Sequence, residues 1–240
     1  MPISKLQVNQ ILNSGGTATP PSSATYLVAC FSHTGSNHTA GPGTVQWDGT
    51  GMASRIYKDG PAAWSANAIY ILDRPDVSGL AALTWTNAGW DAFLYWLRYV
   101  DHISPVLATG HVSGAPDDYI DIVVGGSPTT NDFLMYAAAK DTTGAGWSLA
   151  TSDDTHNMGG GSIGFASEWG SGGASDYGRF GSAGDASMCG AGIAIKYARE
   201  GGASQAIWMM IERAKKFYED LKLGLIPPQD LLRRHREVYI

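Results

Sequence analysis

The 240-residue chain is predicted to be mainly β, a two-layer antiparallel sandwich followed by a C-terminal α-helical appendage. Three observations predict this. Residues 92–106 are apolar on both faces of a strand, about ten short strand candidates precede residue 198, and an apolar period of three to four begins at Ala203. We therefore expect three parts: an N-terminal strand or arm with a linker (1–23), a β-sandwich (24–198) and a helical attachment segment (199–240).

The first third of the chain is predicted to form strands separated by turns. Leu6 to Leu12 alternates apolar and polar side chains, which is typical of an edge strand or an N-terminal arm, and a Gly/Pro/Ser-rich linker follows. Apolar residues on both faces predict a buried strand at 24–32. The DGTG sequence after Trp47 predicts a tight hairpin between 45–47 and 52–58. Two further strands are expected at 66–72 and 80–86.

The stretch 92–106 is predicted to be a central strand. Phe93 and Tyr95 share one face of it, while Leu94 and Trp96 share the other, so both faces should be covered. Arg98 can bury its aliphatic stem and keep its charged head at the rim. We expect five later strands, at 119–124, 133–139, 164–169, 177–180 and 188–195, with a polar surface excursion at 142–161.

A different pattern follows residue 203. One apolar stripe runs down a predicted helix of about five turns, which Gly224 ends, and a second short helix is expected at 229–238. Burying six stripe residues would contribute about 10 kcal/mol, so the stripe needs a surface to cover it. The helix packs on its own sandwich, docks on another subunit, or forms a seam with copies of itself. The predicted partner-binding residues are Ile207, Met210, Ile211, Ala214, Phe217, Tyr218, Leu221, Arg233, Arg234 and Arg236.

Charge and composition limit the classes of partner that the protein is expected to bind. Residues 1–198 carry eight Lys and Arg against 16 Asp and Glu, whereas residues 199–240 carry eight against six. Phosphate is repelled by such an acidic body, so nucleic acid is not expected as a partner. No segment is apolar for the roughly 20 residues that a membrane span needs, and the N-terminus has no secretion signal. Cys30 and Cys189 are the two cysteines; they form one bridge or remain buried thiols.

Residues suited to catalysis or metal binding occur without a matching pattern. Glu168 could pair with Asp153, Asp154 or Asp176 as in a glycosidase, but no spacing brings them together. The groups Asp117, Asp118 and Asp121, or Asp153 and Asp154, offer oxygen ligands for Ca²⁺ without a complete calcium loop. The histidines lack a paired zinc spacing. We therefore expect no enzyme activity, no catalytic residues, no metal and no cofactor.

Four tryptophans flank predicted loops. Exposed indole rings could stack on sugars, or they could plug the ends of the sandwich. The candidate carbohydrate-binding residues are Trp64, Trp90, Trp147 and Trp169.

Residues 24–196 resemble a concanavalin-like jelly-roll β-sandwich family found in secreted bacterial proteins and bacteriophage virions. The segments that carry this resemblance are YLVACFS, VQWDGTGM, AIYILDRP, LTWT, FLYWLRYVDHISPV, FLMYAAAK and CGAGIAIK. It implies a jelly-roll fold and a binding or display role, with no shared catalytic set. The expected function is a non-enzymatic structural component of a bacteriophage-like virion, assembled in the host cytoplasm, that docks through its C-terminal helices on capsid, neck or tail proteins. It is expected to form a homo-oligomer, and a host-surface glycan is a candidate ligand. The alternative is a carbohydrate-binding, lectin-like or host-receptor-binding module.

Overall fold

A computed structural model describes most of the chain before residue 199. It covers residues 2–11, 15–34, 41–60, 65–140, 148–149, 154–158, 163–198 and the single positions 211, 214, 215, 219 and 222. Residues 1–100 and 104–197 form one compact unit, called here the β body. Its strands are β1 (Ser4–Ile11), β2 (Gly16–Ala18), β3 (Tyr26–Thr34), β4 (Val45–Trp47), β5 (Thr50–Gly51), β6 (Ala53–Asp59), β7 (Ser65–Asp73), β8 (Ala81–Trp85), β9 (Trp90–Arg98), β10 (Val106–Val124), β11 (Phe133–Lys140), β12 (Ser148–Leu149), β13 (Asp154–Met158), β14 (Ile163–Trp169) and β15 (Asp176–Ile195).

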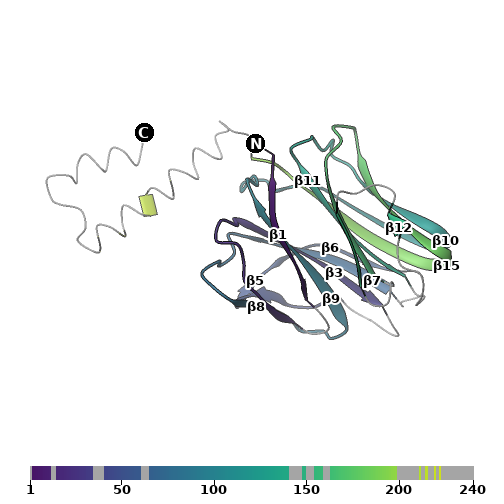
Figure 1. Ribbon diagram of the computed structural model, residues 1–240, viewed down its shortest axis with the longest axis horizontal. Coiled ribbons are helices and arrows are strands. Elements are labelled where there is room, and N and C mark those ends of the chain that lie inside the picture. The colour runs from purple at the N-terminus through teal and green to yellow at the C-terminus, as the bar shows by residue number, and fades with distance from the viewer. Residues whose placement is uncertain are drawn as a thin grey trace. The chain divides into compact units, whose positions relative to one another are not determined.

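The strands form three antiparallel sheets (Figure 1). A five-stranded sheet has the order β1-β9-β3-β7-β6, and a four-stranded sheet has the order β2-β8-β4-β5. The six-stranded sheet has the order β10-β15-β11-β14-β13, with β12 paired to β15. The mainly β, antiparallel sandwich character expected from the sequence is confirmed.

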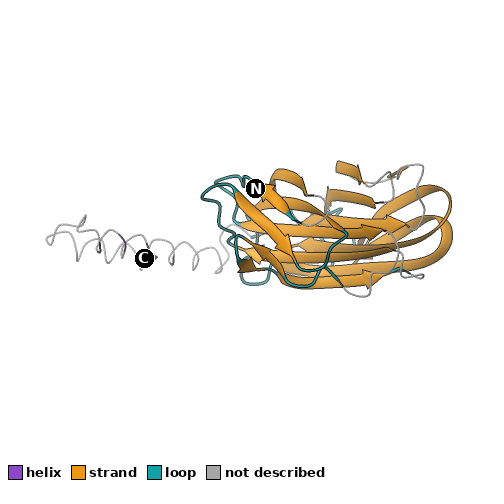
Figure 2. Cartoon of the chain, turned by 90° about the horizontal axis from the view of Figure 1, so that it is seen from below, coloured by secondary structure: helices purple, strands orange, loops and turns teal. Residues whose placement is uncertain are grey.

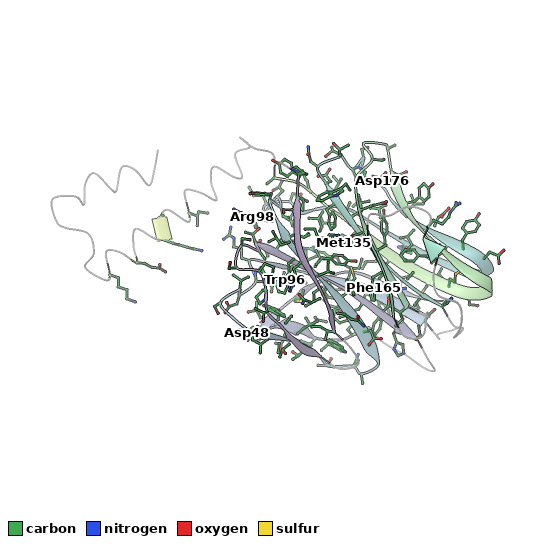
Figure 3. All side chains as sticks on the ribbon, in the orientation of Figure 1. Asp48, Trp96, Arg98, Met135, Phe165 and Asp176 are labelled. Atoms are coloured by element: carbon green, nitrogen blue, oxygen red, sulfur yellow. The ribbon has the colours of Figure 1, made fainter. Side chains whose placement is uncertain are left out.

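The five-stranded sheet is covered on both faces, which explains the apolar pattern of β9. Phe93 and Tyr95 pack in a core with Met135 and Phe165 of the six-stranded sheet. On the opposite face, Trp96 packs in a second core with residues of the four-stranded sheet. Figure 3 labels Met135, Phe165 and Trp96 in these layers. The sandwich therefore has three sheets where two were expected, because the short strands before residue 90 form a sheet of their own.

The central strand is shorter than expected. β9 ends at Arg98 because Tyr99 has a φ of 65°, in the left-handed region, and cannot continue the ladder. Arg98 itself is exposed, as expected, and its guanidinium lies 4.8 Å from the centre of the Tyr99 ring.

The N-terminal segment is a strand of the five-stranded sheet. β1 pairs with β9 along its length, and Ile3 and Ile11 at its two ends are buried. The DGTG turn is also present: Asp48 and Gly49 have φ values of 45° and 76° and join β4 to β5, as a type I′ hairpin requires. The hairpin partner expected at 52–58 is wrong, because the chain leaves this sheet after β5 and β6 pairs with β7 in the five-stranded sheet.

Most of the predicted C-terminal helix lies outside the described residues. The five single positions described between 211 and 222 have helical backbone, and the appendage otherwise stays a prediction. Within the part of the chain that the structure describes, no helix has the length and apolarity needed to cross a membrane.

Candidate recognition face

The two longest strands of the protein form a ribbon that bends back on itself. β10 and β15 pair from Val106 opposite Ile195 to Val124 opposite Asp176. Their register is irregular between Gly114 and Tyr119, where the ribbon bends. Figure 2 shows this bend at the right-hand end of the sheets. The outer half of the ribbon, residues 119–124 and 176–181, is thereby laid over the six-stranded sheet.

Side chains point alternately to the two sides along the outer half of the ribbon, and one of these two faces is buried. Ile120, Ile122, Val124 and Phe180 pack in a cluster with Tyr136 and other residues of β11, on the side of the six-stranded sheet away from the five-stranded sheet. The face is fully enclosed at Ile122, Val124 and Phe180, each 0% exposed. The ribbon therefore has a packed backing.

Glycines let the two halves of the ribbon approach closely. A Cβ on Gly110 would lie 1.8 Å from the carbonyl oxygen of Val123, and a Cβ on Gly192 would lie 2.8 Å from Cγ2 of Val124. A Cβ on Gly190 would likewise lie 2.4 Å from Cδ1 of Ile122. No side chain fits at these positions, so glycine is what permits the fold-back.

The opposite face of the outer half is exposed and carries aromatic and charged side chains. We call this set the ribbon face: Tyr119, Asp121, Val123, Tyr177 and Arg179. The exposed fractions of Tyr119, Val123 and Tyr177 are 45%, 52% and 45%. These three large side chains lie on the same side of the paired strands, opposite the cluster that backs the ribbon.

Arg179 is held at the centre of the ribbon face. It lies directly across the ladder from Asp121. Its Nε donates to Oδ1 of Asp121 at 2.7 Å, and its Nη2 donates to Oδ2 at 2.6 Å. The hydrogen bonds to Asp121 raise the pKa of Arg179 further above its usual range. The guanidinium carbon also lies 4.3 Å from the centre of the Tyr119 ring and 5.7 Å from that of Tyr177.

This arrangement suits binding. Two aromatic rings, a fixed guanidinium and a carboxylate stand on a backing that does not need to reorganise, which lowers the entropic cost of association. Tyrosine and arginine are the side chains most often found where binding energy concentrates. The ribbon face is therefore the candidate functional site.

The two tryptophans that the structure describes among the four proposed from the sequence, Trp90 and Trp169, do not form one platform. Trp90 is only 1% exposed, because it begins β9 opposite His33 and its ring packs against the imidazole at 5.4 Å. Its predicted exposure is wrong. Trp169 is half-buried, with its ring 4.8 Å from that of Phe133. Trp90 and Trp169 lie at opposite ends of their sheets, while Trp64 and Trp147 lie outside the described residues.

The carboxylates considered for catalysis hold loops and strands. Asp176 accepts hydrogen bonds from the backbone N–H and the hydroxyl of Ser171. Glu168 accepts one from the hydroxyl of Tyr136 at 2.7 Å. Asp121, a candidate calcium ligand, is instead the partner of Arg179. Across the described ranges, no three His, Cys, Asp or Glu side chains are placed to hold a metal ion.

The two cysteines are buried free thiols. Cys189 donates to the hydroxyl of Ser65, and Asn67 donates to both the carbonyl oxygen and the sulfur of Cys189. Burial raises the pKa of Cys189 from 9.0 to about 12 and that of Cys30 above this range. Both thiols therefore stay protonated at neutral pH and are poor nucleophiles.

The partner-binding residues proposed for the C-terminal helix stay predictions. Among them the structure describes Ile211, which is 42% exposed, and Ala214, which is half-buried. The others lie outside the described residues: Ile207, Met210, Phe217, Tyr218, Leu221, Arg233, Arg234 and Arg236.

The ribbon face was missed in the sequence, although a signal for it was present. The alternation in residues 119–124 and 176–180 shows that one face of each strand is apolar and buried, but not that the two strands pair. With that pairing, Tyr119, Tyr177 and Arg179 fall on one surface. Comparison of the chain with family models, curated proteins and solved structures returned no match.

Proposed function

We propose that this chain is a non-enzymatic display protein of a bacteriophage-like virion. In this proposal a β body of jelly-roll type presents the ribbon face outward, and the segment 199–240 attaches it to the capsid, neck or tail. The observation that carries the display role is the ribbon face itself, three exposed apolar side chains around the Arg179–Asp121 pair on a tightly packed backing.

Support for a non-enzymatic role comes from how the reactive groups are used. The carboxylate of Asp132 accepts from the backbone N–H groups of Thr129 and Tyr197, and Asp176 is bound by Ser171. Both cysteine thiols are buried and protonated. These groups serve the fold, whereas the exposed Tyr119, Tyr177 and Arg179 add nothing to the core.

Support for attachment through the C-terminal segment comes from the sequence. Its apolar stripe needs a covering surface, and its charge is positive while residues 1–198 are acidic. The attachment surface is predicted to include the stripe residues and the three arginines named above. We propose an oligomer on the particle, since repeated copies of a weak recognition face gain avidity.

Sedimentation of particles tests this proposal. When virion particles are assembled in the presence of the full chain, the chain should sediment with the particles in a density gradient. A chain that ends at residue 198 should stay in the soluble fraction. Circular dichroism of the truncated chain is the control for folding of the β body. If both chains stay soluble, or both sediment with particles, attachment through residues 199–240 is wrong.

The second candidate is a lectin-like or host-receptor-binding module that acts without a particle. The exposed tyrosines of the ribbon face favour it as much as they favour display. Sedimentation separates the two, because a free module would not enter the particle fraction.

A further inference from the structure

The ribbon face is too small to be a protein interface by itself. Its side chains span about 13 Å along two paired strands, each of which occupies a width of about 4.8 Å, so the face covers an area of the order of 130 Å². A stable protein complex buries about 800 Å² on each partner. A ligand that this surface can hold is therefore small, of the size of a short oligosaccharide.

Charge around the ribbon face excludes an anionic ligand. The Arg179 guanidinium is neutralised by Asp121 in a two-point ion pair. Asp118 is exposed beside Tyr119, and residues 1–198 carry a large acidic excess. Phosphate, sulfate and carboxylate groups would therefore be repelled by this acidic body. A cationic ligand is disfavoured as well, because the Arg179 guanidinium already lies over both tyrosine rings. The ligand is therefore neutral.

The space between the tyrosines is not a groove for a peptide. Arg179 lies over both rings, 4.3 Å and 5.7 Å from their centres, and fills the gap that a proline-rich chain would need. What remains is a flat surface with aromatic edges and polar groups in its middle. A ligand must lie across it and offer both apolar C–H groups and hydroxyls.

From these observations we propose that the ribbon face binds a neutral glycan, an inference that rests on the proposed display function. The apolar C–H groups of pyranose rings contact the parts of Tyr119 and Tyr177 that Arg179 leaves exposed. Two of the five N–H groups of Arg179 go to Asp121, and other N–H groups of the same guanidinium can donate to sugar hydroxyls. Asp121 fixes the guanidinium and acts as a positioning residue.

A glycan array probed with the full chain tests the proposal. We expect retention on neutral glycans, with little change when salt rises, because no net charge is involved. Titration of the best neutral glycan should then show that Tyr119→Ser and Tyr177→Ser each weaken binding about tenfold, which corresponds to about 1.4 kcal/mol. Tyr57→Ser is the matched control: Tyr57 is 38% exposed on β6 and should not affect binding.

Three results would overturn the proposal. They are retention of no neutral glycan, binding confined to sulfated or sialylated glycans with steep salt dependence, and unchanged affinity in both ribbon-face variants with unchanged melting midpoints. Failure here is separable from failure of the display function. If Tyr119→Ser and Tyr177→Ser chains still sediment with particles, attachment stands whatever the ligand is.

Discussion

Glycine at a few positions decides how the β10–β15 ribbon folds. Gly110, Gly190 and Gly192 lie in the inner half of the ribbon, beneath the outer half, and each would place a Cβ within 3 Å of it. Gly190 and Gly192 fall in the strand expected at 188–195, whereas the segment around Gly110 was not expected to be a strand, since glycine weakens a strand. The structure shows the other use of glycine, close approach of one backbone to another.

Substitution of Gly110 tests this packing. Gly110→Ala would place a methyl group 1.8 Å from the Val123 carbonyl oxygen, so the outer half must shift. We expect the free energy of unfolding, measured by urea denaturation, to fall by about 1–3 kcal/mol or more. Gly125→Ala is the control, because no heavy atom lies within 4 Å of its added methyl group. That control should change stability by about 0.5 kcal/mol or less, and equal losses in the two variants would refute the fold-back packing.

Buried thiols and phenols make the β body sensitive to alkaline pH. Burial raises the pKa of Cys189 from 9.0 to about 12, and burial also raises the pKa of Tyr26 and Tyr136. A group whose pKa is raised by folding stabilises the protein fully below its unfolded pKa and loses that effect as pH rises toward its folded pKa. Stability should therefore decline above pH 9, by up to about 1.4 kcal/mol per pH unit for each group.

Urea midpoints at pH 7 to 11 measure this effect. Cys189→Ser retains a hydroxyl that can hydrogen-bond Ser65 and removes one ionisable group. We expect this variant to lose less stability than the wild type between pH 9 and 10. A midpoint that stays constant to pH 11 would mean that the thiol and phenol groups are not enclosed.

At the scale of elements, strands with a strong pattern are predictable and their partners are not. The two-faced apolar pattern of β9 and the DGTG turn are both confirmed. The third sheet was missed because alternation looks the same whichever sheet covers a strand. β10 and β15 were each read as shorter segments, because their glycines interrupt the apolar pattern. The prediction that Trp90 is exposed was wrong, because a residue that flanks a loop can still begin a buried strand.

The N-terminal strand should be essential to the β body. β1 covers the edge of β9, and Trp96 Nε1 donates to the side-chain oxygen of Asn9 at 2.7 Å. Deleting residues 1–11 removes the buried Ile3 and Ile11 and uncovers the backbone of a strand that is apolar on both faces. We expect the shortened chain to aggregate, as measured by size-exclusion chromatography.

A point substitution provides the control for this deletion. Asn9→Ala removes the two hydrogen bonds that the Asn9 side-chain oxygen accepts, from Trp96 Nε1 and Gln7 Nε2. It should cost about 2 kcal/mol and should leave the chain soluble. A chain without residues 1–11 that behaves as a monomer with the wild-type melting midpoint would show that β1 is a dispensable arm.

At the scale of the whole molecule, the proposed function divides two tasks between two parts of the sequence. The β body stacks three sheets, and the outer half of its ribbon carries the proposed recognition surface on one side of them. Residues 199–240 are proposed to provide attachment. The fold class was predictable from the sequence, but the recognition surface was not, because Tyr119 and Tyr177 are 58 residues apart and meet only through the pairing of β10 with β15.

Hydroxyl-radical footprinting of the tyrosines tests the central claim, recognition at the ribbon face, most directly. Tyr57, Tyr119 and Tyr177 are all exposed in the structure and should be oxidised in the free protein. When the full chain is mixed with the best neutral glycan from the array, we expect Tyr119 and Tyr177 to be protected and the oxidation of Tyr57 to be unchanged. Protection of Tyr57 with continued oxidation of Tyr119 and Tyr177 would contradict the central claim.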